Sequence, residues 1–460
     1  MTDTAPAPAP AATPDRPAAP PQAVAALAAE LRLLLGDDGV SLERPVRERA
    51  SADGARMSPV IVEQLPLGLA DLVAWPAGAG QIAATVAAAV RHGVPVTPRG
   101  KGTGNYGQAI PMRGGLVLDT TRARAIVEVG SGYATVEAGV AMAAIEHAAN
   151  ETGQQVLMYP STANSTIGGF LSGGSGGTGS IRHGMLHQGF ALALDVVHAT
   201  GDGTLVHVEG ADAEPYIHNY GTAGIIARAT VRLEPLQEWR GFFASFDTFE
   251  QALSVIRAFG DLEPTPRLVS ADPAPLAATL PADPGIPAGR ASLRGILDLA
   301  SLGDATALVE SAGGRVEIVR EGAQAMLKIS RMSYNHPVEW LQKAHPGVYF
   351  HVEVSGDALV DRIAEVEAVY PGGMLHIEAQ KGRPIGMLVG EYVGAAEVYA
   401  GFGRLTALGV GFHNPHQWFV DYEPERTAAL AATTDPHGLL NPGKLRRDGR
   451  HHDVATGDQR

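Results

Sequence analysis

Hydrophobic and polar positions follow a helical period in some segments of the chain and a strand period in others. Apolar, alanine-rich segments at 24–35 and 79–93 predict two packed helices, and Gly93 marks where the second ends. A further helix is predicted over 141–153. Short runs rich in β-branched residues and bounded by glycine or polar turns predict the strands: 94–98, 115–120, 125–130, 133–139, 156–160, 191–201, 203–210 and 224–235.

The pattern changes near residue 240. Residues 245–260 predict a helix that begins with a capping box, formed by Thr248 and Gln251. The proline-rich stretch 262–289 predicts a long surface loop. The rest of this region is typical of a second α+β domain with an antiparallel sheet, because it predicts strands at 290–300, 348–356 and 374–380 and a helix at 357–370.

Composition adds limits to this picture. A chain of 460 residues is too long for one core. A net charge of -14 argues against a nucleic-acid surface, and the absence of cysteine excludes disulfides, thiolate zinc sites, iron–sulfur clusters and a cysteinyl cofactor bond. No apolar run is long enough to span a membrane. We therefore expect a soluble protein in the cytoplasm that has no nucleic-acid partner and no membrane span.

The first glycine-rich loop, GTGNYG at Gly102–Gly107, has the spacing of a dinucleotide fingerprint. A Rossmann fingerprint requires a helix directly after the loop. Here Pro111 and Gly114-Gly115 forbid one, and no P-loop lysine follows. The interpretation that remains is a nest of backbone N–H groups that holds phosphate, with Arg99 and Lys101 adding positive charge, although a mobile turn stays an alternative.

A second glycine-rich stretch lies about sixty residues later. It holds seven glycines between Gly168 and Gly179, interleaved with serine and threonine. A flexible linker is the simplest alternative. However, Ile167, Phe170 and Leu171 are apolar anchors, and strands are predicted on both sides. Two such loops in one domain predict two walls of one extended cofactor site.

Four segments resemble the FAD domain of the vanillyl-alcohol oxidase / p-cresol methylhydroxylase (PCMH) superfamily, nearest in pattern to its glycolate oxidase and D-lactate dehydrogenase branch. They are VTPRGKGTGNYGQ, YPSTANSTIGGFLSGGSGGTGSIRHG, YGTAGIIARATVRLEP and DPHGLLNPGKL. The resemblance covers about residues 70–235 and 435–445. It implies an α+β fold: a PCMH-type FAD-binding domain of two α+β subdomains plus an α+β cap domain with an antiparallel sheet.

The resemblance also implies a division of the chain and a set of FAD contacts. The expected segments are a disordered tail (1–22), the FAD-binding domain (23–240), a cap over the substrate (241–400), a C-terminal segment that returns to the FAD domain (401–447) and a flexible tail (448–460). The implied FAD-binding residues are Arg99, Gly100, Lys101, Gly102, Thr103, Gly104, Asn105, Ser161, Thr166, Gly168, Gly169, Arg182, His183, Gly184, Ile226, Asn441 and Lys444.

Two departures from the superfamily change what is expected. Some relatives attach FAD covalently through a histidine in the first glycine loop, where this chain has Asn105 and Tyr106, so we expect non-covalent FAD. The GDGN motif that follows a histidine in metal-assisted 2-hydroxy-acid dehydrogenases is missing, which weakens a D-lactate or glycolate assignment. His183 and His187 lie in a glycine-rich loop without an acidic third ligand, so no metal site is predicted.

The cap region contains the candidates for acid–base chemistry. Histidine is the usual base near neutral pH, and MSYNHPVEW and GFHNPHQWFVD are dense in histidine, asparagine and aromatic residues for segments expected to be strands and loops. A surface or structural histidine is the alternative at each position. The candidate catalytic residues are His336, His413 and His416, with Tyr334 and then His183 as the next choices.

The predicted function is an FAD-dependent oxidoreductase that transfers a hydride from a small alcohol, hydroxy acid or related CH–OH substrate to FAD. The alternatives are a flavin-fold binding or scaffold protein without catalysis and a reductase on the same fold. Substrate identity, a homo-oligomeric state and the electron acceptor, O₂ or another, stay open.

Overall fold

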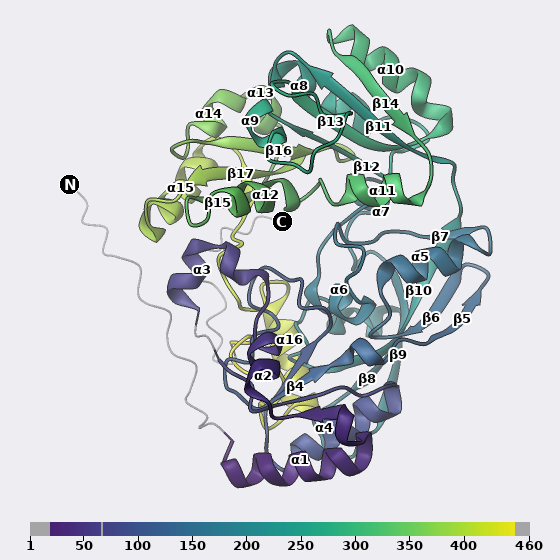
Figure 1. Cartoon of the computed structure of the whole chain (residues 1–460), viewed down its shortest axis with the longest axis vertical. Coiled ribbons are helices and arrows are strands. Elements are labelled where there is room, and N and C mark those ends of the chain that lie inside the picture. Colours follow the sequence, from purple (N-terminus) through teal and green to yellow (C-terminus); the bar gives the residue numbers. More distant parts are fainter. Residues whose placement is uncertain (1–18, 66–67, 447–460) are drawn as a thin grey trace.

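The computed structural model describes residues 19–65 and 68–446, so residues 1–18 of the predicted tail at 1–22 and all of the predicted tail at 448–460 lie outside the described residues. The first helix begins at Pro21, inside the range predicted as a tail. Figure 1 shows two bodies, one above the other. The lower body holds two sheets and the upper body a single large one. We call residues 19–238 the N-terminal body, residues 239–413 the cap and residues 414–446 the C-terminal segment.

The first sheet of the N-terminal body is small and mainly parallel. Its order is β1-β2-β4-β3, in which β2, β4 and β3 run parallel and β1 is antiparallel to β2. Helix α4 packs its buried face, which includes Ile82 and Val86, against this sheet. The elements are α1 (Pro21–Leu35), β1 (Val40–Ser41), α2 (Arg44–Ala50), α3 (Pro59–Gln64), β2 (Leu72–Ala74), α4 (Ala79–Arg91), β3 (Val96–Arg99) and β4 (Leu116–Asp119).

The second sheet is antiparallel and has six strands in the order β5-β6-β10-β8-β9, with β7 paired to β10. Val197 of β8 and Ile225 of β10 belong to the same buried cluster as α1 and α4, so the two sheets share one core. The elements are β5 (Ile126–Gly130), β6 (Tyr133–Glu137), α5 (Met142–Asn150), β7 (Gln154–Val156), α6 (Ile167–Gly173), α7 (Ser180–His183), β8 (Ala191–Val197), β9 (Leu205–Glu209) and β10 (Ile225–Pro235).

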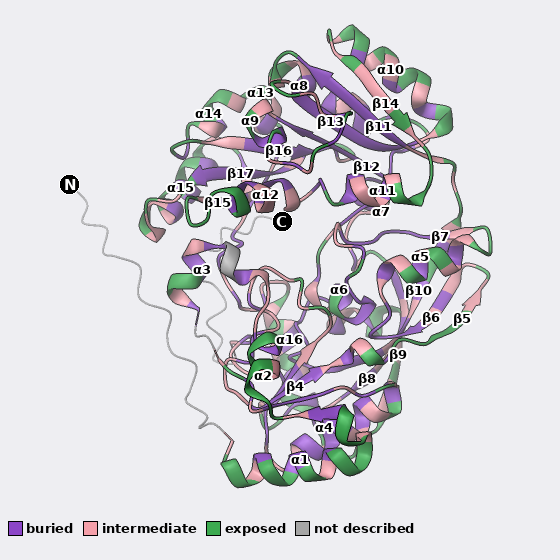
Figure 2. Ribbon diagram, in the orientation of Figure 1, coloured by how far each residue is buried: buried purple, intermediate pink, exposed green. Residues whose placement is uncertain are grey.

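The cap is built on one antiparallel sheet of eight strands in the order β14-β11-β13-β12-β16-β17-β15-β18. Its strands are mostly buried (Figure 2). They are β11 (Trp239–Phe246), β12 (Leu268–Asp272), β13 (Ala291–Asp298), β14 (Arg315–Arg320), β15 (Tyr349–Ser355), β16 (Met374–Glu378), β17 (Ile385–Glu391) and β18 (Gly411–His413).

Helices cover the cap sheet. The predicted capping box is confirmed, because the Thr248 hydroxyl accepts from Gln251 N and the Gln251 side chain reaches back to Thr248 N at the start of α8. The cap helices are α8 (Phe249–Gly260), α9 (Ala274–Ala277), α10 (Leu302–Ser311), α11 (Ala323–Ser330), α12 (His336–Ala344), α13 (Ala358–Asp361), α14 (Ile363–Glu367) and α15 (Ala395–Ala407).

The C-terminal segment leaves β18 and crosses back to the N-terminal body, where its yellow trace and α16 (Pro424–Thr434) lie in Figure 1. Ala199 N donates to Thr434 O at 2.7 Å, and Asn441 N donates to Val96 O at 2.7 Å. The segment therefore contacts both sheets of the N-terminal body. Within the described residues, no helix has the length and apolarity to cross a membrane.

The predicted α+β class with an antiparallel cap sheet is confirmed, while three local predictions are wrong. The predicted strand 156–160 ends at Val156, because residues 157–160 are buried against other loops and pair only through one bridge, Tyr159 to Thr178. The predicted surface loop 262–289 contains β12, fully buried between β13 and β16, with its prolines at the flanks of the strand. The segment from His336 is helix α12, with Pro337 in its first turn.

A series of buried ion pairs connects three neighbouring strands in the middle of the cap sheet, β13, β12 and β16. Arg294 of β13 pairs with Asp272 of β12, and His376 of β16 lies between two carboxylates, with Nδ1 2.8 Å from Asp272 Oδ1 and Nε2 2.8 Å from Glu378 Oε1. Burial alone would lower the pKa of His376, but the two carboxylates raise it to about 9. All four side chains are almost completely buried, so each charge depends on its partners.

Arg294→Met should therefore lower the free energy of unfolding by about 3–5 kcal/mol, because Asp272 loses one of its two cationic partners inside the core. Urea unfolding followed by tryptophan fluorescence measures this change. The matched control is Arg257→Met, which breaks a partly exposed pair with Asp361 and should change the unfolding midpoint little. Equal effects of the two substitutions would contradict the role given to this series of buried ion pairs.

Candidate functional site

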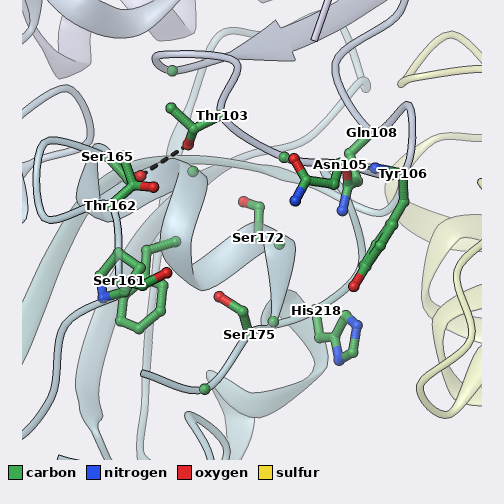
Figure 3. Close-up of a pocket in the computed structure, with 18 of the residues that line it drawn as sticks. Thr103, Asn105, Tyr106, Gln108, Ser161, Thr162, Ser165, Ser172, Ser175 and His218 are labelled. Carbon is green, nitrogen blue, oxygen red and sulfur yellow. Dashed lines mark hydrogen bonds between the residues drawn. The ribbon is translucent and has the colours of Figure 1, made fainter. Parts of the chain in front are cut away.

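A cavity of about 500 Å³ lies between the N-terminal body and the cap. Its floor and one wall are the two glycine-rich loops, at residues 98–109 and 160–176, and part of its other wall comes from α12, β15, β17 and β18 of the cap. Figure 3 shows the loop side, where the side chains of Thr103, Ser161, Thr162, Ser165, Ser172 and Ser175 surround the opening.

The two glycine-rich loops touch each other directly. A Cβ atom at Gly100 would lie 2.1 Å from Thr166 Oγ1, so only glycine allows this approach. The hydroxyls of Thr103 and Ser165 are 2.8 Å apart and join the same loops (Figure 3). Thr166 also accepts a hydrogen bond from Gly169 N and begins α6. At the last residue of α6, Gly173, a Cβ would meet no protein atom within 4 Å, so this glycine borders open space at the cavity wall.

His336, the first residue of α12, lines the cavity from the cap. Its Nδ1 is 3.0 Å from Glu339 Oε2, three residues on in the same helix, and its Nε2 is 3.1 Å from Thr162 Oγ1 of the second loop. Asn105 Nδ2 donates to the other Glu339 oxygen at 3.1 Å. Burial alone would raise the pKa of Glu339, but these partners lower it to about 2. The Glu339 carboxylate therefore orients the His336 ring across the boundary between cap and loops.

His413 of β18 lies at the same end of the cavity, within a denser cluster. Its Nδ1 is 3.1 Å from Glu353 Oε2, its Nε2 pairs with Asp421, and the Tyr106 hydroxyl donates to Glu353. His218 Nε2 lies 3.2 Å from the other Asp421 oxygen. Burial alone would lower the pKa of His413, but Glu353 and Asp421 raise it to about 10. His413 is therefore a cation at neutral pH, and both of its ring nitrogens have carboxylate partners.

Comparison with known proteins identifies the domain that contains both glycine-rich loops. Residues 70–209 match a protein family described as FAD binding domain. This part of the chain is an FAD-binding domain. The predicted resemblance to the PCMH-type FAD domains is thereby confirmed, and FAD is the cofactor.

Curated relatives match mainly over this domain. An uncharacterized FAD-linked oxidoreductase of Mycobacterium tuberculosis strain H37Rv is 31% identical over 193 residues, which are 40% of this chain and 42% of that protein. The glycolate oxidase subunit GlcD of Bacillus subtilis is 32% identical over 205 residues, 41% of this chain and 43% of that protein. The chain thus spans about two fifths of the length of the curated relatives it matches.

Solved structures resemble the whole fold. An alkyldihydroxyacetonephosphate synthase structure has a TM-score of 0.72 at 15% identity and covers 95% of this chain and 89% of that chain. The 4-ethylphenol oxidase of Gulosibacter chungangensis has a TM-score of 0.66 at 15% identity, covering 92% of this chain and 97% of that chain. The likeness of fold to these two structures therefore includes the cap and the C-terminal segment as well as the FAD-binding domain.

The cavity fits FAD on its own geometry. Neutral hydroxyls and glycine backbone line the loop side, and hydroxyl and backbone N–H donors suit phosphate oxygens. In the described part of the N-terminal body, no carboxylate lines the cavity, while Arg99 and Lys101 do. The FAD-binding domain therefore offers an anion site along its loops that leads to the histidines of the cap.

The residues predicted to bind FAD fall into two groups in the structure. The larger group lines the cavity: 99–105, Ser161, Thr166, Gly168, Gly169, Gly184 and Ile226. The second group does not line it. Arg182 and His183 turn toward Glu234, at 3.4 and 3.3 Å. Asn441 and Lys444 instead donate hydrogen bonds to backbone carbonyls of the first loop.

Lys444 is completely buried and its Nζ donates to Gly107 O, and burial lowers its pKa to about 7. Asn441 Nδ2 donates to Gln108 O at 2.9 Å and to Tyr220 O at 2.8 Å. Both side chains satisfy carbonyl groups at the end of the first loop. The C-terminal segment thus fixes the loop in place and does not face the cavity itself.

The other two predicted catalytic residues are placed differently. Tyr334 lines the cavity, but its hydroxyl donates to Gly177 O and its backbone N–H donates to Glu378 Oε1 at 2.6 Å. Burial raises the pKa of Tyr334 well above its usual value, so it stays a donor. His416 lies outside the cavity lining, with Nδ1 2.7 Å from Ser58 Oγ, and burial lowers its pKa to about 3.

The sequence analysis did not single out several residues of the site. Glu339 could have been found from its spacing of three residues from His336, given a helix there. Glu353 and Asp421 meet His413, and His218 meets Asp421, through tertiary packing, and no local pattern marks these residues. Among the described residues, no group of three or more histidine or carboxylate side chains is placed so that it could hold a metal ion.

Gly173→Leu should reduce FAD content to below about a tenth of the parent, since a Cβ at this position meets no protein atom within 4 Å and the side chain starts out in the open space of the cavity. The helix itself gains from the change, because leucine favours helix over glycine by about 0.5–1 kcal/mol. Flavin absorbance per protein after reconstitution measures the loading. Gly403→Leu is the matched control, on an exposed face of α15 with nothing within 4 Å, and should load normally. Full loading of Gly173→Leu would show that FAD does not lie along α6.

Proposed function

We propose that the chain is an FAD-dependent oxidoreductase that removes a hydride from the CH–OH carbon of a small substrate. The observation that carries this proposal is the placement of His336: an oriented imidazole on the cap, facing the loops of an FAD-binding domain across one cavity. Relatives named D-lactate dehydrogenase and D-2-hydroxyglutarate dehydrogenase act, by their names, on CH–OH groups, which supports this substrate class.

Bound FAD supplies the acceptor for the hydride. The oxidation also releases the proton of the substrate hydroxyl, and the chain must accept it. Glu339 can only accept a hydrogen bond, because its pKa of about 2 keeps it ionised, so His336 Nδ1 carries the proton of that bond. The lone pair of His336 Nε2 then faces Thr162 Oγ1, and a substrate hydroxyl approaching from that side donates its proton to Nε2.

His336 is a better base than the other two predicted histidines. His413 is already protonated and would have to give up an ion pair with Glu353 or Asp421 to act as one. His416 is buried behind the cavity lining. We therefore assign proton acceptance to His336, orientation of its ring to Glu339, and hydrogen-bond donation at the second loop to Tyr334.

His336→Gln should slow flavin reduction by about 10²–10⁴-fold, the usual contribution of a positioned base, while the spectrum of bound FAD stays unchanged. Anaerobic stopped-flow reduction with a reducing alcohol or hydroxy acid measures the rate. His345→Gln, an exposed histidine just after α12, is the matched control and should reduce at the parental rate. A His336→Gln variant that reduces as fast as the parent would assign the base elsewhere. Reoxidation of the same samples with O₂ distinguishes an oxidase from a dehydrogenase.

We also propose that FAD is held without a covalent bond. The chain has no cysteine, and the first glycine loop carries Asn105 and Tyr106 where a histidine would form the bond. The Tyr106 hydroxyl is engaged with Glu353. After acid precipitation of the holoprotein, the flavin should remain in the supernatant. Yellow colour in the washed pellet would contradict this expectation.

A further inference from the structure

The cap end of the cavity is built to face an uncharged group. Among the described residues that line this end, none is an arginine or a lysine. The lining instead combines carboxylates, histidines, neutral polar side chains and apolar side chains, which are Glu339, Glu353, His336, His413, Tyr334, Asn335, Gln380, Ile385 and Met387.

The histidines do not replace the missing cations, because their nitrogens already have partners. His413 is a cation, but its Nδ1 and Nε2 are paired with Glu353 and Asp421. His336 Nδ1 is paired with Glu339, and its Nε2 meets the Thr162 hydroxyl. At His413 both ring nitrogens are held in ion pairs, and at His336 only Nε2, which meets the neutral Thr162 hydroxyl, lies outside an ion pair. Because Nε2 of His336 receives the hydroxyl proton in the proposed function, neither ring offers an N–H to a substrate carboxylate without losing that role or separating an ion pair.

The remaining positive groups at the cavity lie on the loop side. Arg99 and Lys101 belong to the first glycine loop, and Arg99 donates to Ala52 O at 2.6 Å. His218 lines the cavity, but its Nε2 is paired with Asp421 and its Nδ1 is buried. Around the cap end, Glu339, Glu353 and Asp421 face three histidines, so the histidines supply at most one positive charge for each carboxylate. Lys343 lies 3.8 Å from Glu339 but does not line the cavity.

We infer that the substrate is a neutral CH–OH compound, such as an alcohol or a hydroxy amide, and that the site discriminates against 2-hydroxy carboxylates. This inference rests on the proposed function, which places the substrate between the flavin and the cap. A carboxylate bound there would lose its water shell and gain no cation, while Glu339 and Glu353 repel it. A neutral group makes hydrogen bonds to the same carboxylates and packs on Ile385 and Met387.

Matched pairs that differ only in charge test this directly: glycolate with glycolamide, D-lactate with D-lactamide, and D-mandelate with D-mandelamide. Each is titrated into the FAD-loaded full chain at about pH 7.5, where the acids are ionised. The change in the flavin spectrum gives a Kd, and anaerobic bleaching gives a rate. In at least one pair the amide should bind tenfold or more tightly than its acid, and in no pair should the order reverse. A carboxylate that binds more tightly than its amide, or amides that show no advantage in any pair, overturns the inference.

Glu353→Gln separates charge from packing, because it removes one negative charge at almost constant shape. It should shift the ratio of the two Kd values toward the carboxylate by at least threefold, whereas Glu391→Gln, an exposed position on β17, should not. An unchanged ratio in Glu353→Gln also overturns the inference. If amides bind preferentially but no compound bleaches the flavin, the charge preference stands and the proposed oxidoreductase function fails.

Discussion

The direct contact between the two glycine-rich loops is the constraint on which the rest of the site depends. At Gly100 the first loop approaches Thr166 so closely that a single methyl group would collide with its hydroxyl. That contact sets the start of α6, whose last residue borders the cavity. The C-terminal segment completes the arrangement, since Lys444 and Asn441 bond the carbonyls of Gly107 and Gln108. Side chains of the C-terminal segment thus hold the first loop, which forms the floor of the cavity together with the second loop.

Buried ion pairs in the core of the cap hold the residues that face the two loops. The buried series from Arg294 through Asp272 and His376 ends at Glu378, which accepts from Tyr334 N. Tyr334 has a positive φ of 54° and extends its hydroxyl to Gly177 of the second loop. This series of buried ion pairs therefore reaches from the middle of the cap sheet to the FAD-binding domain, and α12 with His336 begins two residues later.

Much of the fold could be predicted from periodicity and turn residues, as α4 with its stop at Gly93 and α8 with its capping box show. The failures have a physical reason. Residues 157–160 are apolar because they are buried, yet their backbone pairs with loops and not with a sheet. Strand β12 is not predicted because prolines flank it in the sequence and suggest a loop. They lie outside the strand, where the missing N–H groups cost no hydrogen bonds of the sheet.

The residues of the site also fall into those that a local sequence signal predicts and those that it does not. The loop residues from Arg99 to Asn105 lie at the cavity as expected, because glycine spacing is a local signal. The roles of the histidines are not local. His413 and Glu353 are 60 residues apart and Tyr106 and Glu353 are 247 apart, so pairing that turns His413 into a fixed cation cannot be derived from one sequence. His336 and Glu339, three residues apart, form a pair that spacing reveals once the segment is known to be helix α12.

We propose that one FAD molecule lies along both glycine-rich loops and reaches the cap. Amide hydrogen exchange of the chain with and without FAD tests it most directly, because exchange reports backbone protection at each segment. Binding of FAD should slow exchange together in residues 99–106 and 161–176, with weaker protection at 334–339. Protection confined to one loop, or to segments away from the cavity, would contradict the account.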